Sequence, residues 1–272
     1  MRKAQIPCNF FLIWSVFHPK HAVRTCPEKR SFLRCVSGII SYETHYQISF
    51  HHLARRSILD LWERDGFHFL LRDGVQLASS FSHGSNEAAA AMAAAPVKRA
   101  NQPAFLLDGL SLGFTLFALM DLVQREKARF IVAEPCKPLV DWHQELMDGE
   151  RPGFLHDPRV SVEFTPALQI ARKNPKSFHA ILCRSTHERM NLSVAEASDY
   201  FAALKQGGLL ASPGPAGRRL ARTLQKAGFE VSTEAVPASH KGKKTTFHTV
   251  ILGKKGASSP FPRINPDSIL PP

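Results

Sequence analysis

Short apolar segments and amphipathic segments alternate along residues 103–254, a pattern typical of an α/β protein. The apolar segments predict strands at 104–108, 128–134, 159–164, 178–183 and 207–212. Helical patterns cover 114–126, 139–147, 194–206 and 218–227. Strands that alternate with helices form parallel βαβ units with right-handed crossovers. The last two apolar segments, 229–236 and 246–253, have only a basic loop between them, which predicts an antiparallel pair at the sheet edge.

Three shorter apolar runs, LDLWE, FHFLLR and VQLAS, precede this pattern between residues 59 and 79. Asp-Gly pairs separate them, and this dipeptide tolerates the positive φ angles of tight hairpin turns. We therefore expect a small β-meander. The alanine-rich segment Asn86–Ala95 follows it as a strong helix former, which Pro96 ends.

Residues 1–57 show no sustained period of either kind. They hold nine Lys and Arg against two acids, so most of the net charge of +12 lies in this segment. The sequence thus predicts a poorly ordered basic extension at 1–57, a meander and helix at 58–100, a nucleotide-binding domain at 101–255 and a Pro-rich tail at 256–272. A basic segment can contact nucleic acid, but a solvated tail is the simpler interpretation.

Composition narrows the class of protein. No apolar run is long enough to span a membrane, and FFLIWSVF after Met1 has no clear signal-peptide cleavage site. The five cysteines are irregularly spaced, which favours reduced thiols and a cytoplasmic location. The Cys and His residues before residue 36 match no standard zinc spacing, so no metal site is expected.

The segment LLDGLSLGFT at 106–115 carries the clearest candidate site. Asp108 ends the predicted strand, and Gly109 and Gly113 allow a tight turn into the next helix, whose N-terminus suits an anionic or polar ligand. Ser111 stands where a nucleotide-binding loop usually has glycine. The G-x-S-x-G spacing also occurs in hydrolase nucleophile elbows, but no acid and histidine follow in matching contexts.

Glu134 ends the next predicted strand, 21 residues after Gly113. A carboxylate at this strand end can accept hydrogen bonds from both hydroxyls of a ribose. The alternative is a carboxylate that caps the following helix. Together, the loop and the acid favour nucleotide binding.

Several segments, in order, carry a resemblance to a known family: RDGVQLASSFSHGSNEAAAAM, LLDGLSLGFT, FIVAEPCKPLVDW, DPRVSVEF, FHAILC, ALKQGGLLAS and AGFEV. Over residues 59–255 the chain resembles spermidine synthase-like proteins, a branch of the S-adenosylmethionine-dependent methyltransferase superfamily. The resemblance implies a doubly wound, seven-stranded, mostly parallel sheet. It also implies S-adenosylmethionine or its decarboxylated form as ligand, no metal, and a small-molecule amine acceptor. Family members often form homodimers.

The resemblance also implies roles for individual residues. The loop at Asp108, Gly109, Ser111 and Gly113 would face the amino-acid or aminopropyl end of the ligand, Glu134 would hold the ribose, and Gln76 would lie near the ligand.

Two positions depart from the family pattern. Pro166 stands where an acid usually contacts the adenine, and proline offers no acceptor side chain. Arg184 stands where aminopropyltransferases carry the aspartate that deprotonates the attacking amine. A guanidinium cannot accept that proton, which leaves His187 and Glu188 as substitute bases. The expected function is a transferase that moves an aminopropyl or methyl group. A catalytically impaired nucleoside-binding protein and an RNA methyltransferase are the alternatives.

Overall fold

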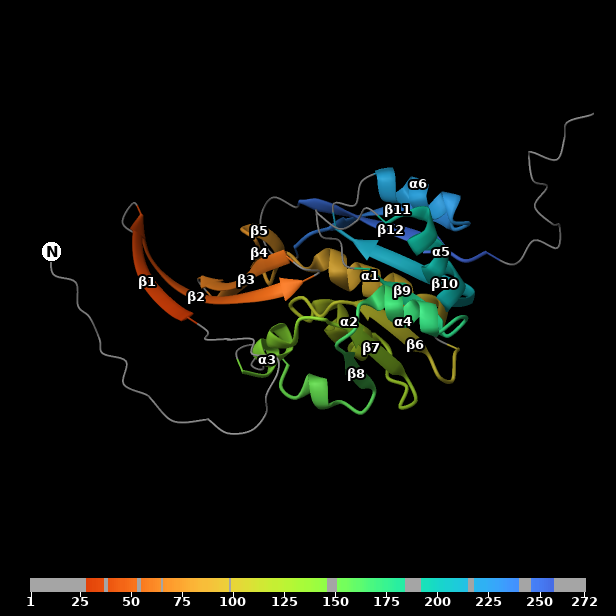
Figure 1. Ribbon diagram of the computed structural model, residues 1–272, viewed down its shortest axis with the longest axis horizontal. Helices are drawn as coiled ribbons and strands as arrows, with labels where there is room; N and C mark the ends of the chain where they lie inside the picture. Colours follow the sequence, from red (N-terminus) through yellow and green to blue (C-terminus); the bar gives the residue numbers. More distant parts are fainter. Residues whose placement is uncertain are drawn as a thin grey trace, which may run out of the picture.

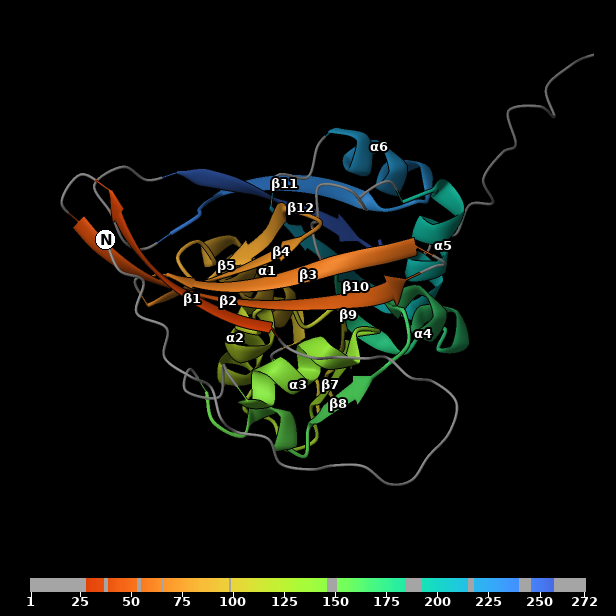
Figure 2. The same ribbon diagram turned by 60° about the vertical axis from the view of Figure 1, so that its left-hand side comes forward.

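The computed structural model describes residues 28–256, apart from 37–38, 53–54, 65, 98, 146–150, 184–191, 215–217 and 240–245, and describes side chains from residue 59 on, Glu145 excepted. The chain forms two sheets, one of five strands and one of seven. In Figure 1 the five-stranded sheet (red to orange) lies at one end of the molecule, and the seven-stranded sheet with its helices forms the rest. Figure 2 shows β1, β2 and β3 from that end, as long strands in front of the body.

The five-stranded sheet is an antiparallel meander in the order β1-β2-β3-β4-β5. Its strands are Glu28–Val36, Ile39–His52, Arg55–Arg64, Phe67–Arg72 and Val75–Ser79. Between β4 and β5, Asp73 and Gly74 have φ angles of 52° and 78°, so this Asp-Gly pair makes the left-handed turn that its sequence predicts. The expected meander is confirmed. It also includes β1 and β2, which lie in a segment where the sequence predicted no strands.

The seven-stranded sheet confirms the predicted fold class. Its order is β11-β12-β10-β9-β6-β7-β8, with β6 to β10 parallel and β11 and β12 antiparallel at one edge. The strands are β6 (Ala104–Asp108), β7 (Arg129–Ala133), β8 (Val160–Glu163), β9 (Phe178–Leu182), β10 (Leu204–Pro213), β11 (Glu230–Pro237) and β12 (Phe247–Lys254).

Helices cover both faces of this sheet. They are α1 (Gly84–Ala94), α2 (Phe114–Leu122), α3 (Lys137–Glu145), α4 (Ala167–Lys173), α5 (Val194–Ala203) and α6 (Arg218–Lys226). Because successive strand residues point to opposite faces, Phe105 and Leu107 of β6 join a core with α1 and α2, whereas Leu106 joins a second core with α4, α5 and α6. The sheet is therefore doubly wound, as expected. The short helix α4 was not predicted from the sequence.

A third cluster of buried side chains connects the two sheets. Leu61 of β3 and Leu70 of β4 pack with Leu112, which follows β6, and with Leu139 and Trp142 of α3. The N-terminal meander thus shares a core with the loop that follows the first parallel strand.

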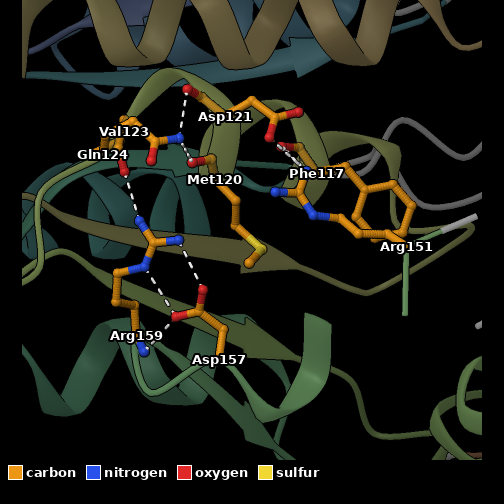
Figure 3. Close-up of polar contacts among 8 residues, drawn as sticks. All are labelled: Phe117, Met120, Asp121, Val123, Gln124, Arg151, Asp157 and Arg159. Atoms are coloured by element: carbon orange, nitrogen blue, oxygen red, sulfur yellow. Dashed lines mark hydrogen bonds and ion pairs between the residues drawn. The ribbon is translucent and has the colours of Figure 1, made fainter. Parts of the chain in front are cut away.

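Two arginines hold the segment before β8 against α2 (Figure 3). Arg159 donates to both carboxylate oxygens of Asp157 and to the carbonyl oxygen of Val123, just after the helix. Arg151 pairs with Asp121 at 2.7 Å and donates to the carbonyl oxygen of Phe117. The Arg159 contact satisfies the carbonyl group of Val123 at the C-cap of α2, where an intrahelical partner is missing.

Candidate functional site

The strand order of the seven-stranded sheet reverses between β6 and β9. From β6 the chain continues to β7 and β8 on one side, while β9 and β10 lie on the other. Open α/β sheets bind ligands in the crevice at the carboxyl ends of the strands at such a point. A cavity of about 110 Å³, partly open to solvent, lies here, and its wall includes Leu107 and Asp108 at the end of β6 and Leu182 and Cys183 at the end of β9.

The loop from Gly109 to Gly113 forms one side of this cavity. Gly109, Ser111 and Gly113 all have left-handed φ angles, of 90°, 53° and 84°. Glycine adopts this conformation without steric cost, but Ser111 holds it at a cost of about 1–2 kcal/mol. Gly113 precedes α2 as its N-cap residue, so the loop leads directly into the helix N-terminus.

His143 of α3 supports the strained residue of the loop. Its Nε2 donates to the carbonyl oxygen of Ser111 at 2.7 Å, and the side chain is fully buried. Burial lowers the pKa of His143 below its usual value, although the Ser111 carbonyl and the charge of Glu134 oppose this shift. The imidazole is therefore neutral near pH 7 and acts as a structural donor.

Glu134 lies behind the loop. Its side chain is 1% exposed, and its carboxylate accepts hydrogen bonds from the backbone N–H groups of Leu110 and Cys136 at 2.9 and 3.0 Å. Glu134 is not among the described residues that line the cavity. The carboxylate thus fixes the backbone of the loop, and a ribose hydroxyl would have to reach a side chain that is almost completely buried.

The cavity carries negative charge. Among the described lining residues Asp108 is the one Asp or Glu, and none is Lys or Arg. Burial, and to a smaller extent the Asp108 charge, raises the pKa of the Cys183 thiol well above its usual value, and burial is also the main reason that the pKa of the Tyr200 hydroxyl is raised. Cys183 therefore stays protonated and is a poor nucleophile, and Asp108 favours a positively charged ligand.

A serine–histidine pair lines another part of the cavity. Ser85 lies in the first turn of α1 and His248 lies on β12, and the Ser85 hydroxyl is 3.2 Å from Nδ1 of His248. Burial lowers the pKa of His248, so this imidazole is also neutral near pH 7. The sequence analysis singled out neither residue, because 163 positions separate them and the resemblance implies no role for either.

The other predicted site residues differ in whether they line the cavity. Asp108, Gly109 and Ser111 line it, whereas Gln76 is exposed on β5 and does not. Pro166 is half-buried at the N-cap of α4. Arg184, His187 and Glu188 lie outside the described residues. A role in ligand binding or catalysis stays a prediction for each of these positions.

Within the described part of the chain, no three His, Cys, Asp or Glu side chains come together in a way that could hold a metal ion. The same residues include no helix that is both long and apolar enough to cross a membrane.

No family model matches the sequence, and no curated protein matches it significantly. The structure, in contrast, is similar to solved spermidine synthases. One, in complex with the transition-state analogue AdoDATO, shares 14% identity over 86% of this chain and 83% of that chain, with a TM-score of 0.61. The spermidine synthase of Thermotoga maritima gives the same identity and coverage with a TM-score of 0.60. A probable spermidine synthase of Corynebacterium glutamicum shares 18% identity over 76% and 79%, with a TM-score of 0.54. The chain therefore has the fold of spermidine synthases, as its resemblance predicted.

Proposed function

We propose that the chain binds a sulfonium nucleoside, S-adenosylmethionine or its decarboxylated form, and transfers an aminopropyl or methyl group to an amine. Bound in the cavity, the sulfonium would supply a carbon that an amine can attack. The observation that carries this proposal is the cavity at the strand-order reversal with the Asp108 carboxylate in its wall. A carboxylate in the cavity wall favours the positive charge that a sulfonium and an ammonium group share.

The loop would bind the ligand through its backbone. Left-handed residues at 109, 111 and 113 let the chain pass close to a ligand, and the hydrogen bonds from His143 and to Glu134 hold this shape in advance. A ribose would have to reach the buried carboxylate of Glu134, whose oxygens can each accept more than one hydrogen bond. Preorganised binding groups lose less entropy when the ligand binds.

A catalytically impaired nucleoside-binding protein is the second candidate, and two observations favour it. The Glu134 side chain is 1% exposed and is not among the described residues that line the cavity, and Pro166 offers no acceptor to an adenine amino group. Such a protein would bind the ligand without transferring a group.

Titration calorimetry separates these candidates. The protein is titrated with S-adenosylmethionine, decarboxylated S-adenosylmethionine and methylthioadenosine, and then incubated with each sulfonium and putrescine. Binding together with a polyamine product supports the transferase, and binding without any product supports the impaired protein. If none of the three ligands binds, both candidates are wrong. Methyl transfer to RNA in place of an amine would support the RNA methyltransferase.

Asp108→Asn tests the charge argument directly. Asparagine keeps the size of the side chain and removes its charge, so we expect the two sulfonium ligands to bind about 10- to 100-fold more weakly, which corresponds to about 1.4–2.8 kcal/mol. Methylthioadenosine is uncharged at its sulfur, so its affinity should change by less than about threefold. Equal losses for all three ligands would contradict a role for the charge.

A further inference from the structure

The proposed transfer needs a base, and the arginine at position 184 cannot serve as one. An amine is protonated near neutral pH and must lose a proton before its lone pair can attack carbon. A substitute must touch the cavity, be unprotonated near neutral pH, and have a free lone pair.

We propose that His248 of β12 accepts the proton of the attacking amine and that Ser85 of α1 holds its ring in the required tautomer. This inference rests on the proposed function, because it assigns a residue of the same cavity. The resemblance to the family implies no role for either residue.

The geometry supports this assignment. Both residues line the cavity, and Ser85 Oγ lies 3.2 Å from Nδ1 of the imidazole. When Nδ1 carries the proton, it donates to the serine oxygen and leaves the lone pair on Nε2. Within the described part of the chain, Nε2 of His248 has no hydrogen-bond partner. A partly buried nitrogen with a lone pair and no partner is available to a ligand.

The charges around the ring are compatible with this role. Burial lowers the pKa of His248, so the ring is unprotonated at pH 7 and above. The other titratable groups in the cavity wall are Asp108 and Cys183, and the thiol stays protonated. The elements packed against β12 also carry charges, but none of them lines the cavity: Glu87 on α1, Glu230 and Glu234 on β11, Lys205 on β10, and Arg218, Arg219, Arg222 and Lys226 on α6.

The proposed step balances as follows. Nε2 of His248 takes one proton from the ammonium group and becomes the imidazolium. The neutral amine then forms a C–N bond to the carbon beside sulfur, and the electron pair of the breaking C–S bond stays on sulfur as a neutral thioether. The new C–N nitrogen carries the positive charge, and the imidazolium returns its proton to solvent.

His248→Asn is the central test. The asparagine amide can still donate to Ser85 from the position of Nδ1, but nothing replaces Nε2. We expect the affinity for decarboxylated S-adenosylmethionine to change by less than about threefold and kcat to fall by about 100-fold or more. The control is His156→Asn, an exposed histidine outside this cavity, which should leave both values unchanged.

The shape of the pH profile distinguishes a base from a structural residue. In the unaltered protein, kcat should level off above the pKa of His248, because the imidazole then deprotonates the bound ammonium. In His248→Asn only amine that is already neutral reacts, so kcat should keep rising through pH 7 to 9. NMR titration of the ring gives a second readout, with a pKa below the usual 6.5, and Ser85→Ala should lower kcat while binding persists.

Transfer by His248→Asn with the rate and pH profile of the unaltered protein would overturn this role of His248 and leave the proposed function standing. An unaltered protein that binds no sulfonium or forms no product would overturn both.

Discussion

The side chain of Glu134 stabilises the loop that borders the candidate ligand site. Its buried carboxylate accepts two backbone N–H bonds, one from Leu110 after β6 and one from Cys136 after β7. In Glu134→Gln, one oxygen becomes an N–H donor that faces a backbone donor, so we expect a loss of about 2 kcal/mol in the free energy of unfolding. Urea denaturation measures this loss.

The matched control for this substitution is Glu163→Gln at the exposed end of β8, which should change the unfolding free energy by less than about 0.5 kcal/mol. A Glu134→Gln protein as stable as its parent would show that the carboxylate is dispensable to the loop and available for a ribose.

The lowered pKa of His143 predicts that the protein becomes less stable as the pH falls below neutral. Because burial lowers the pKa of His143 in the folded state, the unfolded chain takes up a proton more readily once the pH falls below about 6.5. The stabilisation of the folded state by neutral His143 is therefore present in full above pH 6.5, and it decreases as the pH falls toward the pKa of His143 in the folded state. His179 and His248 have lowered pKa values and act in the same direction.

The test compares urea midpoints at pH 7.5 and pH 5.5. His143→Gln keeps a donor for the Ser111 carbonyl and cannot be protonated, so its midpoint should fall less over this interval. An equal fall in both proteins would mean that His143 does not contribute.

The sequence predicted the acid and the loop but not which way the acid faces. A carboxylate at a strand end can turn toward a ligand or toward backbone N–H groups, and the choice depends on Leu110 and Cys136, whose positions only the folded chain defines. The Ser85–His248 pair was beyond prediction for a similar reason, since it forms only when α1 packs beside β12.

At the scale of elements, α2 carries the loop residue Gly113 at one end and is held by arginines near the other. Arg159 has 15% and its partner Asp157 20% side-chain exposure, and three of its donors are used. Lysine cannot reproduce this forked contact, so Arg159→Lys should lose about 1–3 kcal/mol.

Arg151→Lys is the comparison, because Figure 3 shows a similar arrangement at Asp121. The Asp121 side chain is 64% exposed, and exposed pairs contribute about 0–1 kcal/mol. Thermal unfolding of both variants should therefore rank Arg159→Lys as clearly less stable. Equal losses would contradict the argument from burial.

Helices and strands were predicted correctly where buried apolar runs were long and were flanked by turn residues. The strand predicted at 104–108 is β6 itself, and the edge pair is β11 and β12. Helix α4 has only seven residues, too few for a helical period to stand out. Strand β2 was missed although its sequence, IISYETHYQISFHH, alternates apolar or aromatic residues with polar ones, because the scattered Cys, Pro and Arg around it dominated the interpretation.

For the whole molecule, the cluster that connects the two sheets predicts that they unfold together. Leu61 of β3 is 1% exposed and packs in the same cluster as Leu112 of the loop and Leu139 and Trp142 of α3. Leu61→Ala should cost about 2.7–5 kcal/mol through the cavity it leaves. Since the meander and the loop share this core, the loss should move one common transition.

The measurement follows far-UV circular dichroism, which reports all elements, and tryptophan fluorescence, to which Trp142 in the cluster contributes. In Leu61→Ala both signals should shift together to a lower midpoint. The control is Leu122→Ala, at a leucine that is 54% exposed, which should change the free energy of unfolding by less than about 1 kcal/mol with either signal. Two separate transitions in Leu61→Ala, one at the original midpoint, would mean that the meander folds independently. A shared transition would instead link the meander to the site, because Leu112 lies in the loop that forms the cavity wall, and Leu61→Ala should then also weaken ligand binding.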